Sequence, residues 1–212
     1  MSTAHDARFW DRTSRSYARS KITDAAGYER TLGRTRELLK PDDRVLELGC
    51  GTGTTAFRLA DGVAHYLATD FSSRMIAIAQ AKRAEAPIPA LAFQTATADQ
   101  LAAAAATFSA VLAFNYLHLV RDVPGTLRHI QALLAPGGFF ITKTPCLADM
   151  NALLRLAVMP AMRALGRAPH VSVFGVDELR RLMADAAFDV LSTEHHASTD
   201  RDKRHYIVAR RR

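Results

Sequence analysis

Short apolar runs alternate with amphipathic stretches through the middle of the chain. The run RVLELG (44–49) ends at glycines and predicts a buried strand, and TTAFRLA (54–60) behind it predicts a helix. The alternation continues with predicted strands at 64–70, 90–96, 108–117 and 139–145, and with predicted helices at 73–85, 101–106 and 123–138. Strands and helices that alternate through short connections indicate right-handed βαβ units and a parallel sheet.

The two ends of the chain follow different patterns. Residues 6–20 and 25–39 predict two helices ahead of the first strand. The stretch 147–166 is helical in character, and a predicted helix at 176–188 precedes a closing pair of strands at 189–197 and 204–212. An antiparallel strand at the edge of an otherwise parallel sheet is common in α/β proteins.

These elements predict one α/β domain over residues 1–212, because no Gly/Ser-rich linker divides the chain. The expected architecture is Rossmann-like: a doubly wound, mostly parallel seven-stranded sheet with an antiparallel edge strand, an N-terminal helical cap and a helical lid insertion. The expected parts are the cap 1–40, a ligand-binding core 41–146, the lid 147–175, and the closing helix and strands 176–212.

The composition is that of an ordinary globular protein, with 49% hydrophobic and 23% charged residues among 212. It argues against a mainly disordered chain, a collagen-like chain and a coiled coil. Two cysteines, Cys50 and Cys146, cannot build a disulfide framework, and no Cys/His cluster has zinc-site spacing, so we expect no metal. Without an apolar secretory segment or a run of 18 apolar residues, we expect a cytoplasmic protein with no membrane span.

The net charge of +7 and the isoelectric point of about 9.8 favour anionic partners, which include nucleic acid, an acidic membrane surface and anionic metabolites. The densest basic run is Arg210–Arg212, which is typical of a solvated chain end. Arg155, Arg163 and Arg167 lie on one side of an ideal helix in the insertion, so peripheral contact with anionic lipid is one interpretation. A lid packed on the core is the interpretation we favour, because that helix has no clean polar face.

The segment VLELGCGTGTTAFRLA (45–60) is the most informative part of the chain. A predicted strand runs into Gly49, Gly51 and Gly53, and a helix follows, so the backbone can turn tightly and approach a ligand. Asp70 ends the second predicted strand, where an acid can accept hydrogen bonds from two ribose hydroxyls. The pair indicates a nucleoside site at the carboxyl ends of parallel strands.

The glycine spacing argues against two common nucleotide sites. The dinucleotide fingerprint places its third glycine at relative position six, whereas here it falls at position five and Thr54 follows. The chain also lacks the G-x-x-x-x-G-K-[ST] pattern of a phosphate-binding loop. Glu47 would oppose a pyrophosphate in this loop and suits a cationic or amino-bearing ligand better.

The segment ELGCGTG (47–53) resembles motif I of class I S-adenosylmethionine-dependent methyltransferases. Other segments resemble further motifs of that family in the same order: TDFSSRMIAIAQAK (69–82), FSAVLAFNYLHLVRD (108–122) and LLAPGGFFIT (133–142). The segment FWDRTSRSYA (9–18) is similar to the N-terminal helices of small-molecule and ubiquinone-biosynthesis members.

The resemblance implies S-adenosyl-L-methionine as cofactor and S-adenosyl-L-homocysteine (SAH) as product. It implies that Asp70 binds the ribose, that Phe71 and Met75 flank the adenine, and that Tyr17 covers the cofactor. Glu47 is expected to hold the amino group through water. The expected cofactor-binding residues are Tyr17, Glu47, Gly49, Cys50, Gly51, Gly53, Asp70, Phe71, Met75, Thr97, Ala98 and Asn115.

Two positions depart from the pattern of the family. The third-strand motif usually carries an acid or Asn that contacts the adenine edge, whereas here Thr97 and Ala98 stand in its place. We therefore expect the backbone of Ala98 to contribute more than the side chain of Thr97. The fourth-strand motif usually begins Phe-Asp, and Ser109 replaces that acid, which is commonly structural.

Methyl transfer from a sulfonium is a direct displacement, so the protein needs a base only when the acceptor arrives protonated. His118, just past the fourth predicted strand, is the candidate catalytic base, and Asn115 faces the methyl-transfer region. His170 is a second histidine placed to enter the pocket. Each histidine has the alternative role of a satisfied or solvated side chain. Cys50 is expected to be a packed residue rather than a nucleophile.

The sequence thus predicts an S-adenosylmethionine-dependent methyltransferase that acts on a small, partly apolar acceptor. A tRNA or other nucleic-acid methyltransferase is one alternative, suggested by the isoelectric point alone, because the chain carries no RNA-binding motif. A non-catalytic S-adenosylmethionine-binding regulatory protein is another, because it would share the fold. The acceptor, the atom methylated and the oligomeric state stay open.

Overall fold

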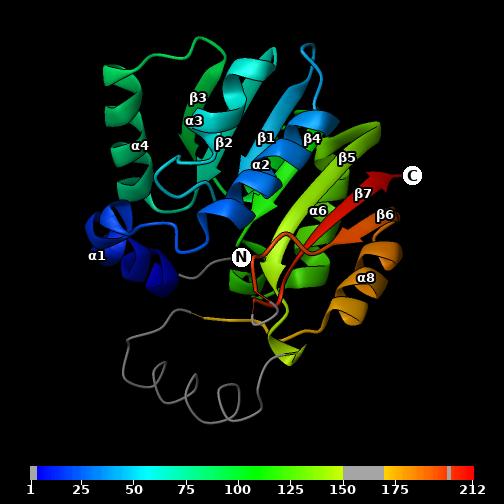
Figure 1. Ribbon diagram of the computed structural model, residues 1–212. Coiled ribbons are helices and arrows are strands. Elements are labelled where there is room, and N and C mark those ends of the chain that lie inside the picture. The colour runs from blue at the N-terminus through cyan, green and yellow to red at the C-terminus, as the bar shows by residue number, and fades with distance from the viewer. Residues whose placement is uncertain (1–3, 150–169, 200–201) are drawn as a thin grey trace.

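The computed structural model describes residues 4–149, 170–199 and 202–212. Seven strands form one sheet in the order β3-β2-β1-β4-β5-β7-β6 (Figure 1). The strands are β1 (Arg44–Leu48), β2 (His65–Asp70), β3 (Leu91–Thr95), β4 (Phe108–Phe114), β5 (Leu134–Pro145), β6 (Phe188–Glu194) and β7 (Arg204–Arg211). Strands β1 to β5 are parallel, and β7 runs antiparallel to both of its neighbours. The predicted Rossmann-like, mostly parallel sheet is confirmed, with the antiparallel strand one place inside the edge.

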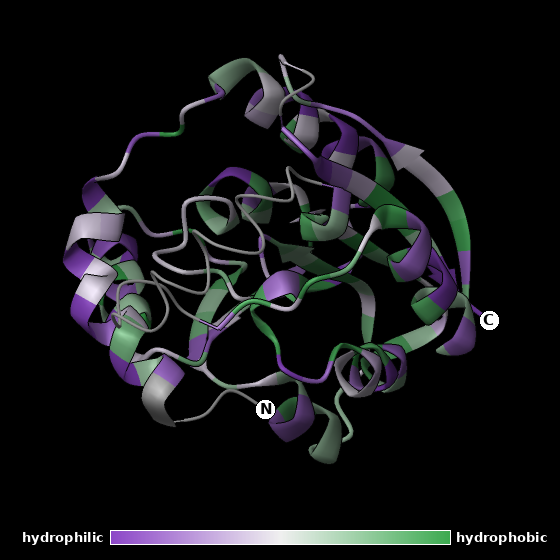
Figure 2. Cartoon of the chain, turned by 90° about the horizontal axis from the view of Figure 1, so that it is seen from below, coloured by the Kyte–Doolittle hydropathy of each residue, from purple (hydrophilic) through white to green (hydrophobic). Residues whose placement is uncertain are grey.

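Helices cover both faces of the sheet. They are α1 (Ala4–Arg19), α2 (Ala25–Leu38), α3 (Ala56–Leu59), α4 (Ser73–Glu85), α5 (Ala98–Ala103), α6 (Val123–Leu133) and α8 (Val176–Asp185), with single 3₁₀ turns at Ala60–Gly62, Leu117–Leu119 and Leu147–Asp149. Most of these helices carry both hydrophilic and hydrophobic residues (Figure 2), as expected for helices that pack one side on a sheet.

Alternation along the strands divides the core into two clusters, one on each face of the sheet. On β1, Leu46 and Leu48 belong to the cluster beneath α6 and α8, whereas Val45 belongs to the cluster beneath α2, α3 and α4. This follows from the period of two in a strand, which turns successive side chains to opposite faces. A strand with apolar side chains on both faces needs helices packed on both faces. The doubly wound arrangement therefore follows from the continuous apolar runs in the sequence.

Several predicted boundaries were wrong, and two of them affect the site. The predicted helix 123–138 ends at Leu133, and β5 begins at Leu134, which pairs with Phe108. Pro136 and Gly137 therefore lie in the strand segment, where Gly137 has φ +75°. The predicted strand 108–117 ends at Phe114, because Asn115 turns the chain with φ +51°. Pairing between strands sets the start of β5 and the end of β4. The local amino-acid composition carries no information about that pairing.

Helix α1 lies at the carboxyl end of the sheet, whereas α2 packs on one face of it (Figure 1). On α1, the Asp11 carboxylate accepts a hydrogen bond of 2.6 Å from the Ser72 hydroxyl at the start of α4. Asp6 forms an ion pair of 2.9 Å with Arg121, just beyond β4. These contacts hold α1 against the ends of β2 and β4.

The predicted lid falls mostly on residues 150–169, which lie outside the described part of the chain, so its packing stays a prediction, as does the division into four parts. Arg155, Arg163 and Arg167 lie there as well. Among the described helices, none is long and apolar enough to cross a membrane.

Candidate functional site

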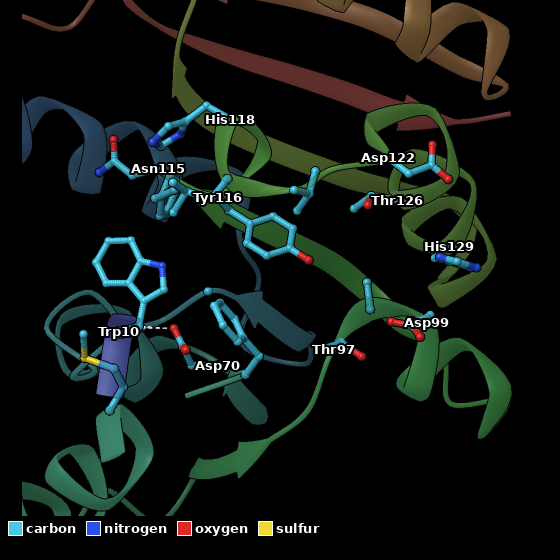
Figure 3. Close-up of a pocket in the computed structure, with 18 of the residues that line it drawn as sticks. Trp10, Asp70, Thr97, Asp99, Asn115, Tyr116, His118, Asp122, Thr126 and His129 are labelled. Atoms are coloured by element: carbon cyan, nitrogen blue, oxygen red, sulfur yellow. Dashed lines mark hydrogen bonds between the residues drawn. The ribbon is translucent and has the colours of Figure 1, made fainter. Parts of the chain in front are cut away.

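A cavity of about 510 Å³ opens at the carboxyl ends of the parallel strands, against α1 (Figure 3). In α/β sheets, ligands bind at this edge. Its lining residues are Trp10, Tyr17, Gly49, Gly51, Asp70, Phe71, Met75, Thr97, Ala98, Asp99, Phe114, Asn115, Tyr116, His118, Leu119, Val120, Asp122, Gly125, Thr126, His129 and Arg204. Figure 3 shows Trp10, Asn115 and His118 toward one side of it and Asp99, Asp122 and His129 toward the other.

The glycine loop that follows β1 forms part of the cavity wall. Gly49 and Gly51 have φ of +70° and +55°, which residues with a side chain rarely adopt. A Cβ on Gly49 would lie 2.6 Å from Cδ2 of Tyr116, and one on Gly51 would lie 3.2 Å from Cε1 of Tyr17. The loop therefore needs glycine both for its backbone conformation and for the aromatic rings packed over it.

Asp70 ends β2 with its carboxylate in the cavity wall. The backbone N–H of Gly51 donates to Oδ2 at 3.0 Å, and that of Ser72 donates to Oδ1 at 2.8 Å. Burial raises the pKa of Asp70 above its usual value, against the lowering effect of these two hydrogen bonds. Each carboxylate oxygen keeps acceptor capacity, so the oriented group suits a ligand with two adjacent hydroxyls.

Three of the predicted cofactor-binding residues do not line the cavity but lie in or under the loop. Glu47 is buried, accepts a hydrogen bond of 2.9 Å from the Tyr66 hydroxyl, and has its pKa raised to about 7 by burial. Burial also raises the pKa of the Cys50 thiol, in agreement with a packed residue. Gly53 faces Phe93, whose Cζ would lie 2.7 Å from a Cβ there.

The other predicted cofactor contacts are brought together in the cavity wall: Tyr17, Gly49, Gly51, Asp70, Phe71, Met75, Thr97, Ala98 and Asn115. Thr97 is committed to local structure, because it is the N-cap of α5 in a capping box with Gln100. Asn115 has φ +51° and donates its backbone N–H to the Lys143 carbonyl at 2.7 Å. Asn tolerates this left-handed conformation better than most residues, so the turn after β4 is fixed in place.

His118 lines the same cavity from the 3₁₀ turn after β4. Its Nδ1 lies 3.1 Å from Oγ1 of Thr144. Burial, with a smaller effect of Arg204, lowers the pKa of His118 to about 4, so the ring is neutral at neutral pH. His170 is not among the lining residues, and its Nε2 lies 3.1 Å from the Ser172 hydroxyl.

Sequence reasoning missed several lining residues. Tyr116 lies next to Asn115 within the fourth-strand motif, so its position after the strand was a usable signal. Trp10 comes from α1 and forms an edge-to-face pair with Tyr17, with ring centroids 6.0 Å apart. Arg204 comes from the start of β7, and only the pairing of β7 with β5 brings it to the cavity.

A second cavity of about 260 Å³ adjoins the first and shares Tyr17, Phe114, Asn115 and Arg204 with it. Unlike the first cavity, it reaches the side of the sheet covered by α2, where Tyr28, Thr31 and Lys143 line it.

One group of potential metal ligands lies outside both cavities. Among the described residues, Cys146, Asp149 and His205 place their ligand atoms within 4.8 Å of one another. Asp149 Oδ2 already accepts a hydrogen bond of 2.9 Å from the backbone N–H of Val176 at the start of α8. That contact gives Asp149 a structural role, and the expectation of no metal stays a prediction.

A profile of the methyltransferase-domain family matches residues 14–193. A ubiquinone biosynthesis O-methyltransferase from Methylocella silvestris is 35% identical over 144 residues, covering 66% of this chain and 52% of that protein. A mitochondrial arginine-hydroxylase from Danio rerio is 30% identical over 190 residues, covering 82% of this chain and 56% of the hydroxylase. The chain thus spans about half the length of these two relatives.

A magnesium protoporphyrin IX methyltransferase from Synechocystis PCC 6803, solved with bound SAH, superposes with a TM-score of 0.73 at 20% identity. The match covers 98% of this chain and 96% of that one. At this identity the likeness establishes the shared fold.

Proposed function

Because the chain belongs to the class I S-adenosylmethionine-dependent methyltransferase family, we propose that it binds S-adenosylmethionine in the 510 Å³ cavity and methylates a small, partly apolar acceptor. The observation that carries this proposal is the Asp70 carboxylate, held by Gly51 and Ser72 at the cavity wall. Phe71 and Met75 line the cavity next to this carboxylate, so the residues present fit a nucleoside with two ribose hydroxyls and an adenine ring.

Asp70 and the residues around it contact different parts of the cofactor. Asp70 accepts hydrogen bonds from the two ribose hydroxyls, and Phe71 and Met75 pack against the adenine. Tyr17 covers the glycine loop and excludes water from the methyl group. Glu47, beneath the loop, favours the positively charged amino group when its carboxyl is ionised.

When bound, S-adenosylmethionine supplies a methyl group already activated by its sulfonium. The chain therefore has to align the acceptor with that methyl group, and alignment contributes several kcal/mol to catalysis. Asn115 and Tyr17 lie where the two cavities meet, so they position the reacting atoms there. For a hydroxyl acceptor, Nε2 of His118 would accept the hydroxyl proton, since the ring is neutral at neutral pH. The bound cofactor would supply the methyl group, with its carbon–sulfur bond broken and SAH as the leaving group.

A small acceptor is supported by the size and chemistry of the cavities. Apolar side chains of Trp10, Phe114, Leu119 and Val120 line the larger one. The relative from Methylocella silvestris is named for an O-methylation in ubiquinone biosynthesis, which supports a phenolic or quinol-like acceptor.

Calorimetric titration with S-adenosylmethionine, SAH and NAD tests the cofactor assignment. We expect micromolar binding of the two sulfur nucleosides and no binding of NAD. Methyl-labelled cofactor is then incubated with phenols, quinols, amines and tRNA. Transfer to a small molecule with release of SAH supports the proposal. Transfer to tRNA alone, or cofactor binding without transfer to any acceptor, contradicts it.

A further inference from the structure

The second cavity begins where the cofactor cavity ends. Tyr17, Phe114, Asn115 and Arg204 line both, so they form the boundary across which a methyl group would pass. Because a direct displacement brings donor and acceptor into line at one carbon atom, the acceptor must approach this boundary from the side opposite the donor. The 260 Å³ cavity adjoins the first across these four residues, so it offers a space from which an acceptor can reach them.

The charges of the two cavities differ in sign. Asp70, Asp99 and Asp122 line the first against Arg204, which lines both, so three acids face one arginine there and a positively charged ligand is favoured. The second is lined by Lys21, Lys143 and Arg204, with Asp24 as the single acid.

The acid of the second cavity is already engaged. Oδ1 of Asp24 accepts from the Gly27 backbone N–H at 2.9 Å and from the Ser198 hydroxyl at 2.7 Å, and Oδ2 accepts from the Ser198 backbone N–H at 2.8 Å. These hydrogen bonds lower the pKa of Asp24, so its carboxylate is ionised, and its oxygen atoms already accept hydrogen bonds from Gly27 and Ser198. Asp202, the other acid near Lys143, is ion-paired with Arg204.

Lys143 has unused capacity to donate hydrogen bonds. Its side chain comes from β5 and is 8% exposed, and Nζ donates to Oγ1 of Thr31 on α2 at 2.9 Å. Within the described residues this is its single hydrogen-bond acceptor, although an ammonium group carries three donors. Burial lowers the pKa of Lys143, as expected for an ammonium with too few partners.

We propose that the second cavity holds the charged end of the methyl acceptor, whose carboxylate binds the Lys143 ammonium, and that the reacting hydroxyl reaches the boundary with the first cavity, which His118 lines. The inference rests on the proposed methyltransferase function and adds the charge class of the substrate. Arg204 is already paired with Asp202, so Lys21 and Lys143 against Asp24 leave a net charge of one positive unit in the cavity. That charge balances one negative charge and favours a carboxylate over a dianionic phosphate.

The test compares two probes that differ in charge, 4-hydroxybenzoate and 4-hydroxybenzamide. Each is titrated at pH 7.5 into the SAH-saturated protein and into the protein alone, so that the preference is measured whether or not SAH binds. We expect the acid to bind at least tenfold more tightly than the amide. Lys143→Met should abolish this preference, whereas Lys40→Met, which removes an exposed lysine on another part of the surface, should retain it.

Different outcomes of these titrations distinguish failure of the acceptor assignment from failure of the proposed methyltransferase function. Equal affinity for acid and amide, absence of binding by both, or a preference that survives in Lys143→Met would overturn the acceptor assignment. A loss of SAH affinity in Lys143→Met equal to the loss of the acid preference would place the carboxylate on the cofactor instead. Failure of SAH to bind the unaltered protein would refute the proposed function itself. Circular dichroism of Lys143→Met, and a Lys143→Arg variant that keeps the charge, separate these results from misfolding.

Discussion

At the scale of single residues, the site depends on how Asp70 is held. Backbone donors from the glycine loop and from the start of α4 fix both carboxylate oxygens, so the group is oriented before a ligand arrives. A ligand then loses less freedom in binding, since the protein side is already ordered.

Asp70→Asn keeps the size of the side chain and removes its charge. We expect SAH affinity to fall by roughly 30- to 150-fold, or about 2–3 kcal/mol, because hydrogen bonds to a charged group contribute about 1.5–3 kcal/mol. Calorimetry measures this, with circular dichroism to verify folding. An unchanged dissociation constant would show that the motif assignment is wrong.

The buried carboxyl of Glu47 makes the free energy of unfolding depend on pH. Its pKa is about 7 in the folded protein against an ordinary value of 4.5, so the folded state holds the proton more tightly. The stabilising contribution is complete below about pH 4.5 and is lost as pH rises through 7, up to about 3 kcal/mol.

Glu47→Gln should therefore raise the free energy of unfolding at pH 8.5 and change it little at pH 4.5. Urea denaturation at the two pH values measures the difference. Glu85→Gln, at an exposed carboxyl on α4, is the matched control and should show no such pH dependence. Equal stability of Glu47→Gln and the unaltered protein at pH 8.5 would refute the assigned cause.

At the scale of elements, helix α1 completes the site from outside the sheet. Trp10 and Tyr17 line the cavity, and Asp11 holds the helix through the Ser72 hydroxyl. Ser72 in turn accepts from the Met75 backbone N–H as the N-cap of α4. One hydroxyl thus joins the cap helix to the element that follows the ribose-binding acid.

Asp11→Ala should loosen α1 and weaken SAH binding several-fold, because the aromatic side chains on this helix lose their fixed position. The loss of the contact to Ser72 corresponds to about 1–2 kcal/mol. Amide hydrogen exchange of residues 6–19 and calorimetry measure the two effects together. Asp42→Ala, at an exposed acid before β1, is the control. Unchanged exchange in Asp11→Ala would contradict this role.

Local signals predicted the elements better than their limits. The strand predicted at 64–70 begins one residue later, at His65, and the helix predicted at 73–85 was correct, with Ser72 as its N-cap. The LAAAAA run was helical only to Ala103, and Ala105 turns the chain with φ +53°. The ends of β4 and β5 were misplaced because strand pairing, which is non-local, decides where each strand stops.

At the scale of the whole molecule, the site joins the two ends of the chain. Its walls come from α1, from the ends of β1, β2 and β4, and from Arg204 on β7. A ligand that contacts all of them binds the folded state and not the unfolded one, so it must stabilise the fold.

SAH at 100 times its dissociation constant should raise the free energy of unfolding by about 2.7 kcal/mol. For a chain of this length, that corresponds to an increase in Tm of roughly 5–10 °C. Differential scanning calorimetry measures the shift, and NAD at the same concentration should produce none. An absent shift at a concentration that saturates the protein would contradict binding at this site.

The sequence by itself determined the Rossmann-like fold class, the glycine loop with its acid, and the family. These features are encoded locally, by apolar periodicity and by residue types at short spacing. Only the tertiary structure decided that Glu47, beneath the loop, and Cys50, within it, are buried and do not line the cavity. It also decided that Trp10 lines the first cavity, that Lys143 lines the second and that Arg204 lines both. Burial and contact between distant segments depend on how strands and helices pack, and no short stretch of sequence carries that information.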